Sequence, residues 1–463
     1  MKIRGYKRFL CMLLTLTFVV SAFAGCGSSD DLKKESDDEM TIMPAPVDDP
    51  EKGTGDEMVH ILSDEVDASE RFLHLKEDKV STGKATGTAD LSNMDSTDAL
   101  KIFSYDLFKQ VSNEKNPIVS PVSAYLALAM AGAGADGASK EEFERIFGSD
   151  FLKTAKQFYT RYNINRSDLI FTTSDAAWIS KKVKTKKDWI NDLDVYFDAK
   201  TKSMDLTKKA VVRDINKWVN AKTNGLIKEM VNKPFSKDTM MALFNAIYFK
   251  GEWVNEFKAE NTYKDEFTLE GGKTVKVDMM HGHAEHLLYI ANNECTGTVL
   301  PYKSGNLAML ALKPNSDMSA REFLNKIDAE YIRDAFDGSE TREVILRLPK
   351  FTVDFDRELN NDLKALGFDT IFNGSEADFS KAFTKTSEVP ALFISLVKQK
   401  AKIIVDEKGT EAAAVTMVTA DCGAALVEEP PVEMFFDEPF VYMIIDTENQ
   451  VPLFMGILDK PNT

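Results

Sequence analysis

The feature that most constrains the fold is a run of ten almost wholly apolar residues, Met240–Phe249. A strand with one wet face alternates apolar and polar residues, and this run does not alternate. We therefore expect a central strand that is covered on both faces. Its one polar interior residue, Asn245, must find hydrogen-bond partners if it is buried. The chain is thus expected to fold in layers on either side of a sheet.

Helical and strand-like patterns surround this run without regular βαβ alternation. Apolar residues at helical spacing predict helices over five ranges: Asp98–Phe108, with Asp95 or Ser96 as N-cap, Pro121–Met130, Lys140–Phe147, Phe151–Tyr162 and Val211–Met230. Alternation with lysines predicts a strand at Val397–Val405, and two apolar strands close the chain, Phe440–Asp446 and Pro452–Leu458. The fold class is α+β.

The first 90 residues have a different composition. Residues 1–26 have a basic start and a short apolar stretch, which predicts a secretion signal. It ends in Phe23-Ala-Gly-Cys26, which resembles the bacterial lipobox, so we expect Cys26 to be acylated; an ordinary signal peptide with a chance cysteine is the alternative. Residues 27–90 hold 18 acidic and 7 basic side chains, which predicts an acidic flexible tether.

The whole chain carries a formal net charge of −17, which argues against nucleic acid or an anionic membrane as the main ligand. We expect membrane contact only through the N-terminal lipid. Its four cysteines are too few for a disulfide framework. A bridge between Cys295 and Cys422 is compatible with that number, but the spacing does not predict it.

No motif for catalysis or cofactor binding has its required context. The chain lacks a Gly-x-Ser-x-Gly elbow, a His-Glu-x-x-His pair and a Walker phosphate loop. His281, His283 and His286 are close enough in sequence to suggest zinc, but His286 would point away from the other two, and no fourth ligand is evident. We expect a solvated surface there. The sequence predicts no enzyme, no metal site and no cofactor.

The segment 406–438 is unusual for a compact domain, because connections of this length are functional or disordered. From Thr410 to Val427 it is small and mildly apolar. Its Glu411-Ala-Ala-Ala stretch favours a buried helix, whereas its threonines and valines favour a strand. A segment with two accessible conformations suits a conformational switch.

Seven motifs, in order, resemble those of the serpin family: Asn116-Pro-Ile-Val-Ser-Pro-Val-Ser123, Asn245-Ala-Ile-Tyr-Phe-Lys-Gly-Glu-Trp253, Leu348-Pro-Lys-Phe351, Leu366-Gly-Phe368, Ala377-Asp-Phe-Ser380, Asp406-Glu-Lys-Gly-Thr-Glu-Ala-Ala-Ala-Val-Thr416 and Pro452-Leu-Phe-Met-Gly456. The resemblance covers residues 91–463. It implies three β-sheets, eight or nine helices, and an exposed reactive-centre loop at about 407–431.

The resemblance also implies a suicide mechanism. A protease cleaves the loop, whose N-terminal side then inserts into the main sheet and traps the protease as an acyl-enzyme. Insertion would begin at a hinge made of Glu407, Gly409, Thr410, Glu411, Ala412, Ala413, Ala414, Val415 and Thr416. Small residues in this hinge insert readily, and a buried charge or proline would not. By this resemblance we expect a hinge of the inhibitory type.

By the same resemblance, Ser120, Ser123 and Asn245 lie in the shutter where the sheet opens, and Trp253 lies in the breach where insertion starts. Gln399 occupies a shutter position that usually holds His. An amide both donates and accepts hydrogen bonds, so the network can persist, but without the protonation behaviour of His.

The bait bond is expected near Cys422, Gly423 and Ala424. The family's usual distance from hinge to bait, counted from Glu407, ends at Gly423, and the loop is longer than in antitrypsin-like members. No Lys or Arg lies between Lys408 and the final hairpin, which argues against trypsin-like targets. Elastase-like or subtilisin-like enzymes fit the small residues better.

The expected partners are extracellular serine proteases, with some cysteine proteases as a further class. We expect a monomer anchored by lipid at the outer face of a bacterial cell envelope. Two alternatives differ in function: a non-inhibitory serpin that acts as a binding or substrate protein, and a solute-binding lipoprotein with two α/β lobes.

Overall fold

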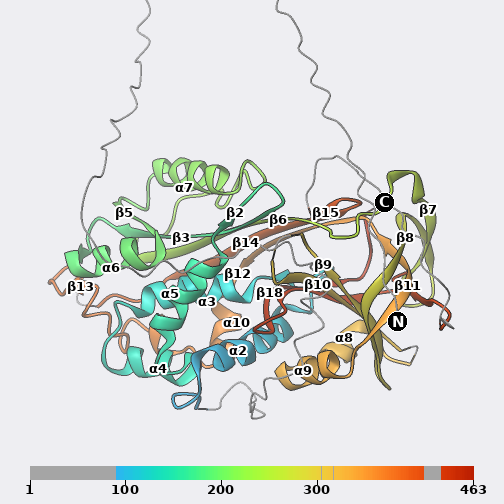
Figure 1. Cartoon of the computed structure of the whole chain (residues 1–463). Helices are drawn as coiled ribbons and strands as arrows, with labels where there is room; N and C mark the ends of the chain where they lie inside the picture. The colour runs from blue at the N-terminus through green and yellow to red at the C-terminus, as the bar shows by residue number, and fades with distance from the viewer. Residues whose placement is uncertain (1–89, 304, 316, 390, 411–428, 463) are drawn as a thin grey trace, which may run out of the picture. The chain divides into compact units, whose positions relative to one another are not determined.

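The computed structural model describes residues 90–303, 305–315, 317–389, 391–410 and 429–462. Outside these residues lie the predicted signal with Cys26, the tether up to residue 89, the hinge from Glu411 to Thr416, and the bait residues Cys422, Gly423 and Ala424. The described chain contains nine α-helices and three sheets (Figure 1), which confirms the predicted fold class and architecture.

The helices are mostly short and amphipathic, and none in the described ranges is long and apolar enough to cross a membrane. They are α2 (Ser96–Val111), α3 (Pro121–Gly132), α4 (Gly137–Phe147), α5 (Phe151–Tyr162), α6 (Lys187–Phe197), α7 (Lys209–Lys222), α8 (Ala320–Leu324), α9 (Ala329–Asp337) and α10 (Asn360–Ala365), with the 3-10 turns η1 (Ala259–Asn261) and η2 (Thr370–Phe372). Asp95 caps α2 by accepting a hydrogen bond from the Thr97 amide.

The prediction for α7 was wrong at its C-terminal end. The expected helix ran to Met230, but α7 ends at Lys222. Asn224 and Gly225 both have positive φ, and this left-handed backbone stops the helix. Apolar residues continue at helical spacing because Ile227 and Met230 still pack on the same cluster from an irregular segment.

Nine strands form the largest sheet, and the predicted final hairpin lies in it. Its order is β1 (Ile118–Val119), β18 (Val451–Leu458), β17 (Phe440–Asp446), β10 (Leu307–Pro314), β9 (Cys295–Pro301), β8 (Thr274–Ala291), β11 (Glu340–Pro349) and β16 (Val432–Phe435), and β7 (Thr262–Thr268) pairs with β8. β16 is the first strand after the loop, and it pairs in parallel with β11.

The predicted central strand and the lysine-faced strand lie in a second sheet of seven strands. Its order is β12 (Phe351–Glu358), β14 (Leu396–Asp406), β15 (Gly409–Thr410), β6 (Met241–Glu252), β3 (Leu169–Ser180) and β2 (Ile164–Asn165), and β5 (Lys200–Met204) pairs with β3. A third sheet joins β13 (Phe383–Thr384) to β4 (Lys184–Thr185).

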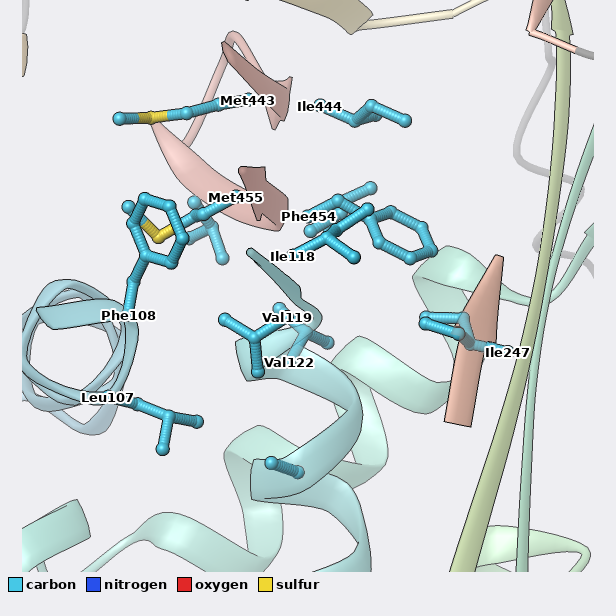
Figure 2. Close-up of a cluster of buried hydrophobic side chains, with 14 of the residues drawn as sticks. Leu107, Phe108, Ile118, Val119, Val122, Ile247, Met443, Ile444, Phe454 and Met455 are labelled. Atoms are coloured by element: carbon cyan, nitrogen blue, oxygen red, sulfur yellow. The ribbon is translucent and has the colours of Figure 1, made fainter. Parts of the chain in front are cut away.

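β6 is covered on both faces, as its sequence predicts. Leu243 and Ile247 face the main core, where Figure 2 shows Ile247 on the same side of the cluster as Phe454 of β18, with Leu107 and Phe108 of α2 on the opposite side. Phe244 faces a second cluster under α7, which contains Trp178 and Trp218. In Figure 1, α7 accordingly lies on the opposite side of this sheet from α2 and α3. Burial on both faces removes the need for alternation.

Candidate functional site

The described part of the hinge already lies within the seven-stranded sheet. β15 lies between β14 and β6 and is antiparallel to both, with Thr410 opposite Val405 and Gly251. Farther along the same strands, residues 396–400 of β14 pair directly and in parallel with residues 242–246 of β6. The two strands are therefore joined over one stretch and separated by the hinge beyond it (Figure 1).

Backbone and charge contacts hold the turn that leads into β15. The amide of Trp253 donates to the carbonyl of Lys408 at 2.8 Å, and its indole N–H donates to the carbonyl of Asp406 at 3.0 Å. Lys350 Nζ donates to both carboxylate oxygens of Glu407, at 2.8 and 3.0 Å. Burial tends to raise the pKa of Glu407, but the hydrogen bond and charge of Lys350 outweigh it, and the pKa is lowered. The turn is thus fixed from both sides.

Thr410 enters a close-fitting pocket in the sheet. Its side chain is fully buried, and its Oγ1 lies 2.8 Å from the hydroxyl of Tyr302. A Cβ on Gly409 would overlap the carbonyl oxygen of Gly251, so the hinge glycine is required for this approach. Sequence reasoning missed Tyr302, because nothing in its neighbourhood signals a contact with a residue 108 positions away.

The predicted shutter residue Gln399 lies directly opposite Asn245 in the β14–β6 register. Its amide makes a two-point contact with the backbone of Ser120: Oε1 accepts from the Ser120 amide at 2.9 Å, and Nε2 donates to the Ser120 carbonyl at 2.8 Å. The Ser120 hydroxyl donates to the carbonyl of Leu453 at 2.6 Å. Gln399 therefore ties β14 to the start of α3 by hydrogen bonds that need no proton uptake.

Asn245 is the centre of the second half of this network. Its Oδ1 accepts from the Ser123 hydroxyl. Its Nδ2 donates to Thr173 Oγ1 at 3.0 Å and to Asp175 Oδ1 at 2.8 Å. The polar residue in the central strand is thus fully satisfied, as its burial requires. The network links α3, β3 and β6 at the stretch where β6 pairs with β14.

Asp175 is a member of this network that sequence reasoning did not identify. It is 1% exposed, it lies opposite Asn245 in the β3–β6 register, and its Oδ2 has no hydrogen-bond partner in the described chain. Burial raises its pKa to about 7, although the hydrogen bond from Asn245 opposes the shift. A lone acidic residue in the apolar stretch Leu169–Ser180 was a signal that could have found it.

The histidines of β8 do not assemble a metal site. His281 stacks on Tyr263 with ring centroids 4.1 Å apart, and His283 Nε2 lies 2.5 Å from Glu343. Within the described chain no group of three or more His, Cys, Asp or Glu side chains is placed to hold a metal ion. Cys295 is a buried thiol whose sulfur lies 3.2 Å from the Tyr331 hydroxyl.

The structure thus brings the predicted shutter and breach residues to one sheet. Ser120, Ser123, Asn245 and Gln399 form connected contacts around β6 and β14, and Trp253 contacts the turn into β15, together with Glu407, Gly409 and Thr410. In this arrangement β14 and β6 pair directly at one end and are separated by β15 at the other, and these residues include no nucleophile with an adjacent general base.

Comparison with known proteins defines the family. Residues 98–461 match the family model described as serpin (serine protease inhibitor). The chain belongs to the serpin family. Human neuroserpin is 27% identical over 79% of this chain and 90% of its own length.

Two solved structures share the fold. The native state of tengpin, a thermophilic serpin, is 29% identical and has a TM-score of 0.72, covering 85% of this chain and 98% of its own. Thyroxine-binding globulin in complex with thyroxine is 24% identical, with a TM-score of 0.70 and coverage of 79% and 99%.

Proposed function

We propose that this serpin inhibits serine proteases by being cleaved in its loop and trapping the acyl-enzyme. The protease serine attacks the carbonyl carbon of the bait residue, the peptide bond breaks, and an ester joins the protease to the loop. Insertion of the loop's N-terminal side into the sheet then carries the protease away before water hydrolyses that ester. The serpin is a single-use inhibitor and not an enzyme.

The observation that supports this proposal is the register of β15. β15 pairs with β14 and β6 through Gly409 and Thr410, and the same register, extended residue by residue, would run into the parallel β14–β6 stretch. Nine residues beyond Thr410, Thr419 would lie opposite Leu396 and Ala242, which is the last pair of that stretch. Residues 411–419 would thus replace the direct β14–β6 pairing with two antiparallel ladders, and antiparallel ladders are slightly more stable per residue.

The residues that would insert match the two faces of this sheet. Thr410 faces the core, so alternate residues Ala412, Ala414, Thr416 and Val418 would face the core as well. Thr416 would lie opposite Asn245 and Gln399, where a hydroxyl can join the shutter hydrogen bonds. Glu411, the one charged residue among them, would face outward beside Lys250.

The same register supports the predicted bait position. If the inserted strand ends at Thr419, the bond between Cys422 and Gly423 lies three residues past its end, close enough to draw a bound protease to the far end of the sheet. Without Lys or Arg in the loop, the partners we propose are extracellular elastase-like or subtilisin-like proteases. A protease meets a single serpin molecule, so the working form is a monomer.

A protease panel tests this function. The domain from residue 91 should form an SDS-stable complex with at least one elastase-like or subtilisin-like protease. Mass spectrometry should place the cut at Cys422–Gly423 or Gly423–Ala424. The cleaved protein should resist heat far better than the intact protein, because the new strand adds a ladder on each side.

The non-inhibitory alternative makes the opposite prediction in the same assay. The fold is shared with thyroxine-binding globulin, whose structure contains thyroxine, so the fold alone does not decide between them. A non-inhibitory member would be cut in the loop, would release active protease and would form no covalent complex. That result with every protease in the panel would overturn the proposal.

We also propose that Cys26 is the lipid attachment site that keeps the inhibitor at the outer face of the cell envelope. Cys26→Ala should move the protein from the membrane fraction to the medium, because the acyl chains supply the anchoring energy at about 0.8 kcal/mol per buried methylene. Cys11→Ala, within the signal, is the matched control and should stay membrane-bound. Membrane association of Cys26→Ala would show that the anchor is elsewhere.

A further inference from the structure

Tyr302 lies on the core side of the seven-stranded sheet, next to the hinge residue Thr410. It follows β9, is fully buried, and stacks on Trp253 with ring centroids 4.6 Å apart and planes 12° apart. Phe249 of β6 meets the same ring edge-on at 5.0 Å. The ring is thus held on two sides by residues of β6 and its extension, which fixes the position of its hydroxyl.

That hydroxyl and the hydroxyl of Thr410 satisfy each other. Their oxygens are 2.8 Å apart, and both side chains are fully buried, so water does not compete. Neither hydroxyl has another hydrogen-bond partner among the described residues. Burial raises the pKa of Tyr302 well above its ordinary value, so the phenol keeps its proton at any physiological pH. Removing either partner would leave the other hydroxyl unsatisfied in the core.

The side chains of Tyr302 and Thr410 are tightly packed, so a larger side chain would not fit at either position without a shift of its neighbours. A Cβ on Gly251 would lie 2.7 Å from Cδ1 of Tyr302, so the ring fills the space beneath the ladder. The Gly409 backbone packs directly on Gly251. A short side chain with a hydroxyl therefore fits at position 410.

We propose that Tyr302 is a positioning residue that recognises the Thr410 hydroxyl and so fixes where loop insertion starts and in which register. Register matters because a slip by one residue would turn every side chain to the other face, and Glu411 would then enter the core. The contact between Tyr302 and Thr410 is present in the intact protein. Its effect on protease trapping rests on the proposed function.

Hydrogen exchange of the intact protein tests the recognition. Tyr302→Phe should raise the exchange rate of the hinge peptide 407–410 by about tenfold, because an unsatisfied buried hydroxyl favours opening. Thr410→Val, of the same shape, should raise it similarly. The double variant removes both hydroxyls and should return to within about threefold of wild type. Tyr442→Phe is the control: Tyr442 is equally buried, and its hydroxyl has no partner in the described chain, so exchange of the hinge should not change.

A second experiment tests the effect on trapping: it measures how much serpin forms the covalent complex and how much is cleaved and released as substrate. Tyr302→Phe should increase the fraction of serpin consumed as substrate several-fold, and the double variant should recover trapping. If Tyr302→Phe leaves hinge exchange unchanged, or if the double variant exchanges as fast as the single ones, Tyr302 does not position the hinge. If exchange behaves as expected and wild type forms no complex, the positioning role stands and the inhibitory function fails.

Discussion

Under the proposed function, Thr410→Arg is expected to convert the protein from an inhibitor into a substrate. In the intact chain Thr410 is fully buried between Val405 and Gly251, with its hydroxyl bonded to Tyr302. An arginine there would have to bury its charge where the native side-chain partner is the uncharged hydroxyl of Tyr302, at a cost on the order of 3–5 kcal/mol. Each 1.4 kcal/mol of barrier slows a step about tenfold, so insertion should slow by about 100-fold or more.

Loop cleavage needs no insertion and should proceed at the wild-type rate. The measurement is the molar ratio of serpin to protease needed for full inhibition, together with the amount of SDS-stable complex. Thr410→Ser keeps the hydroxyl and the size class, and it should trap as wild type does. Efficient trapping by Thr410→Arg would mean that insertion of this hinge is not how the protein acts.

Residues whose role follows from local pattern were predictable from sequence. The apolar run at β6 predicted a strand buried on both faces, and the bounds of α5 follow from its helical spacing alone. The end of α7 was not predictable from apolar spacing, because that spacing continues past the turn at Asn224 and Gly225. The spacing of apolar residues indicates which side chains are buried in the core. An irregular segment can place its side chains in the core as well as a helix can.

Sequence motifs named the residues of the proposed site, but they did not show whether the hinge lies in a loop or in the sheet. The motifs placed Gly409 and Thr410 in a hinge, yet a glycine and a threonine are equally compatible with a loop and a strand. Whether they lie in the sheet depends on long-range partners, namely Tyr302 beneath and Gly251 beside them. Gln399 was expected to preserve a hydrogen-bond network, and it does contact Ser120 at two points, but its specific partners were not readable from the chain.

Stability of the intact protein should fall as the pH rises toward 7, and Asp175 should be the cause. Its ordinary pKa is 3.8, and burial raises it to about 7 in the folded chain. Between these values the folded protein holds one more proton than the unfolded chain, so unfolding becomes easier as pH increases. The contribution is fully present below the unfolded pKa and is lost by the time pH passes the folded one. At about 1.4 kcal/mol per pKa unit, the loss is at most about 4 kcal/mol.

The surroundings of the Asp175 carboxylate agree with a raised pKa. Asp175 Oδ2 has no partner in the described chain, and no Lys or Arg pairs with this carboxylate. The charge of Asp175 also acts on Tyr159 on α5, whose pKa is raised first by burial and then by Asp198 and Asp175. Ionisation therefore puts an uncompensated charge beside Asn245, at the stretch where β6 and β14 are joined.

Asp175→Asn should remove this pH dependence. The amide keeps the shape and an acceptor for Asn245 but has no charge, so the variant should be more stable than wild type at pH 8, and the gain should shrink toward pH 5. Apparent melting temperatures at one scan rate across this range provide the measurement, with an expected difference of several degrees at pH 8.

Asp446→Asn is the matched control, because Asp446 is equally buried but accepts from Arg161 and Tyr162. Removing that charge should destabilise the protein across the whole range, since Arg161 then keeps only its exposed partner Glu448 and the buried hydrogen bonds to position 446 lose their charge. If the melting temperatures of wild type and Asp175→Asn change equally with pH, Asp175 has the same protonation state in the folded and unfolded chains over this range. The prediction would then be wrong.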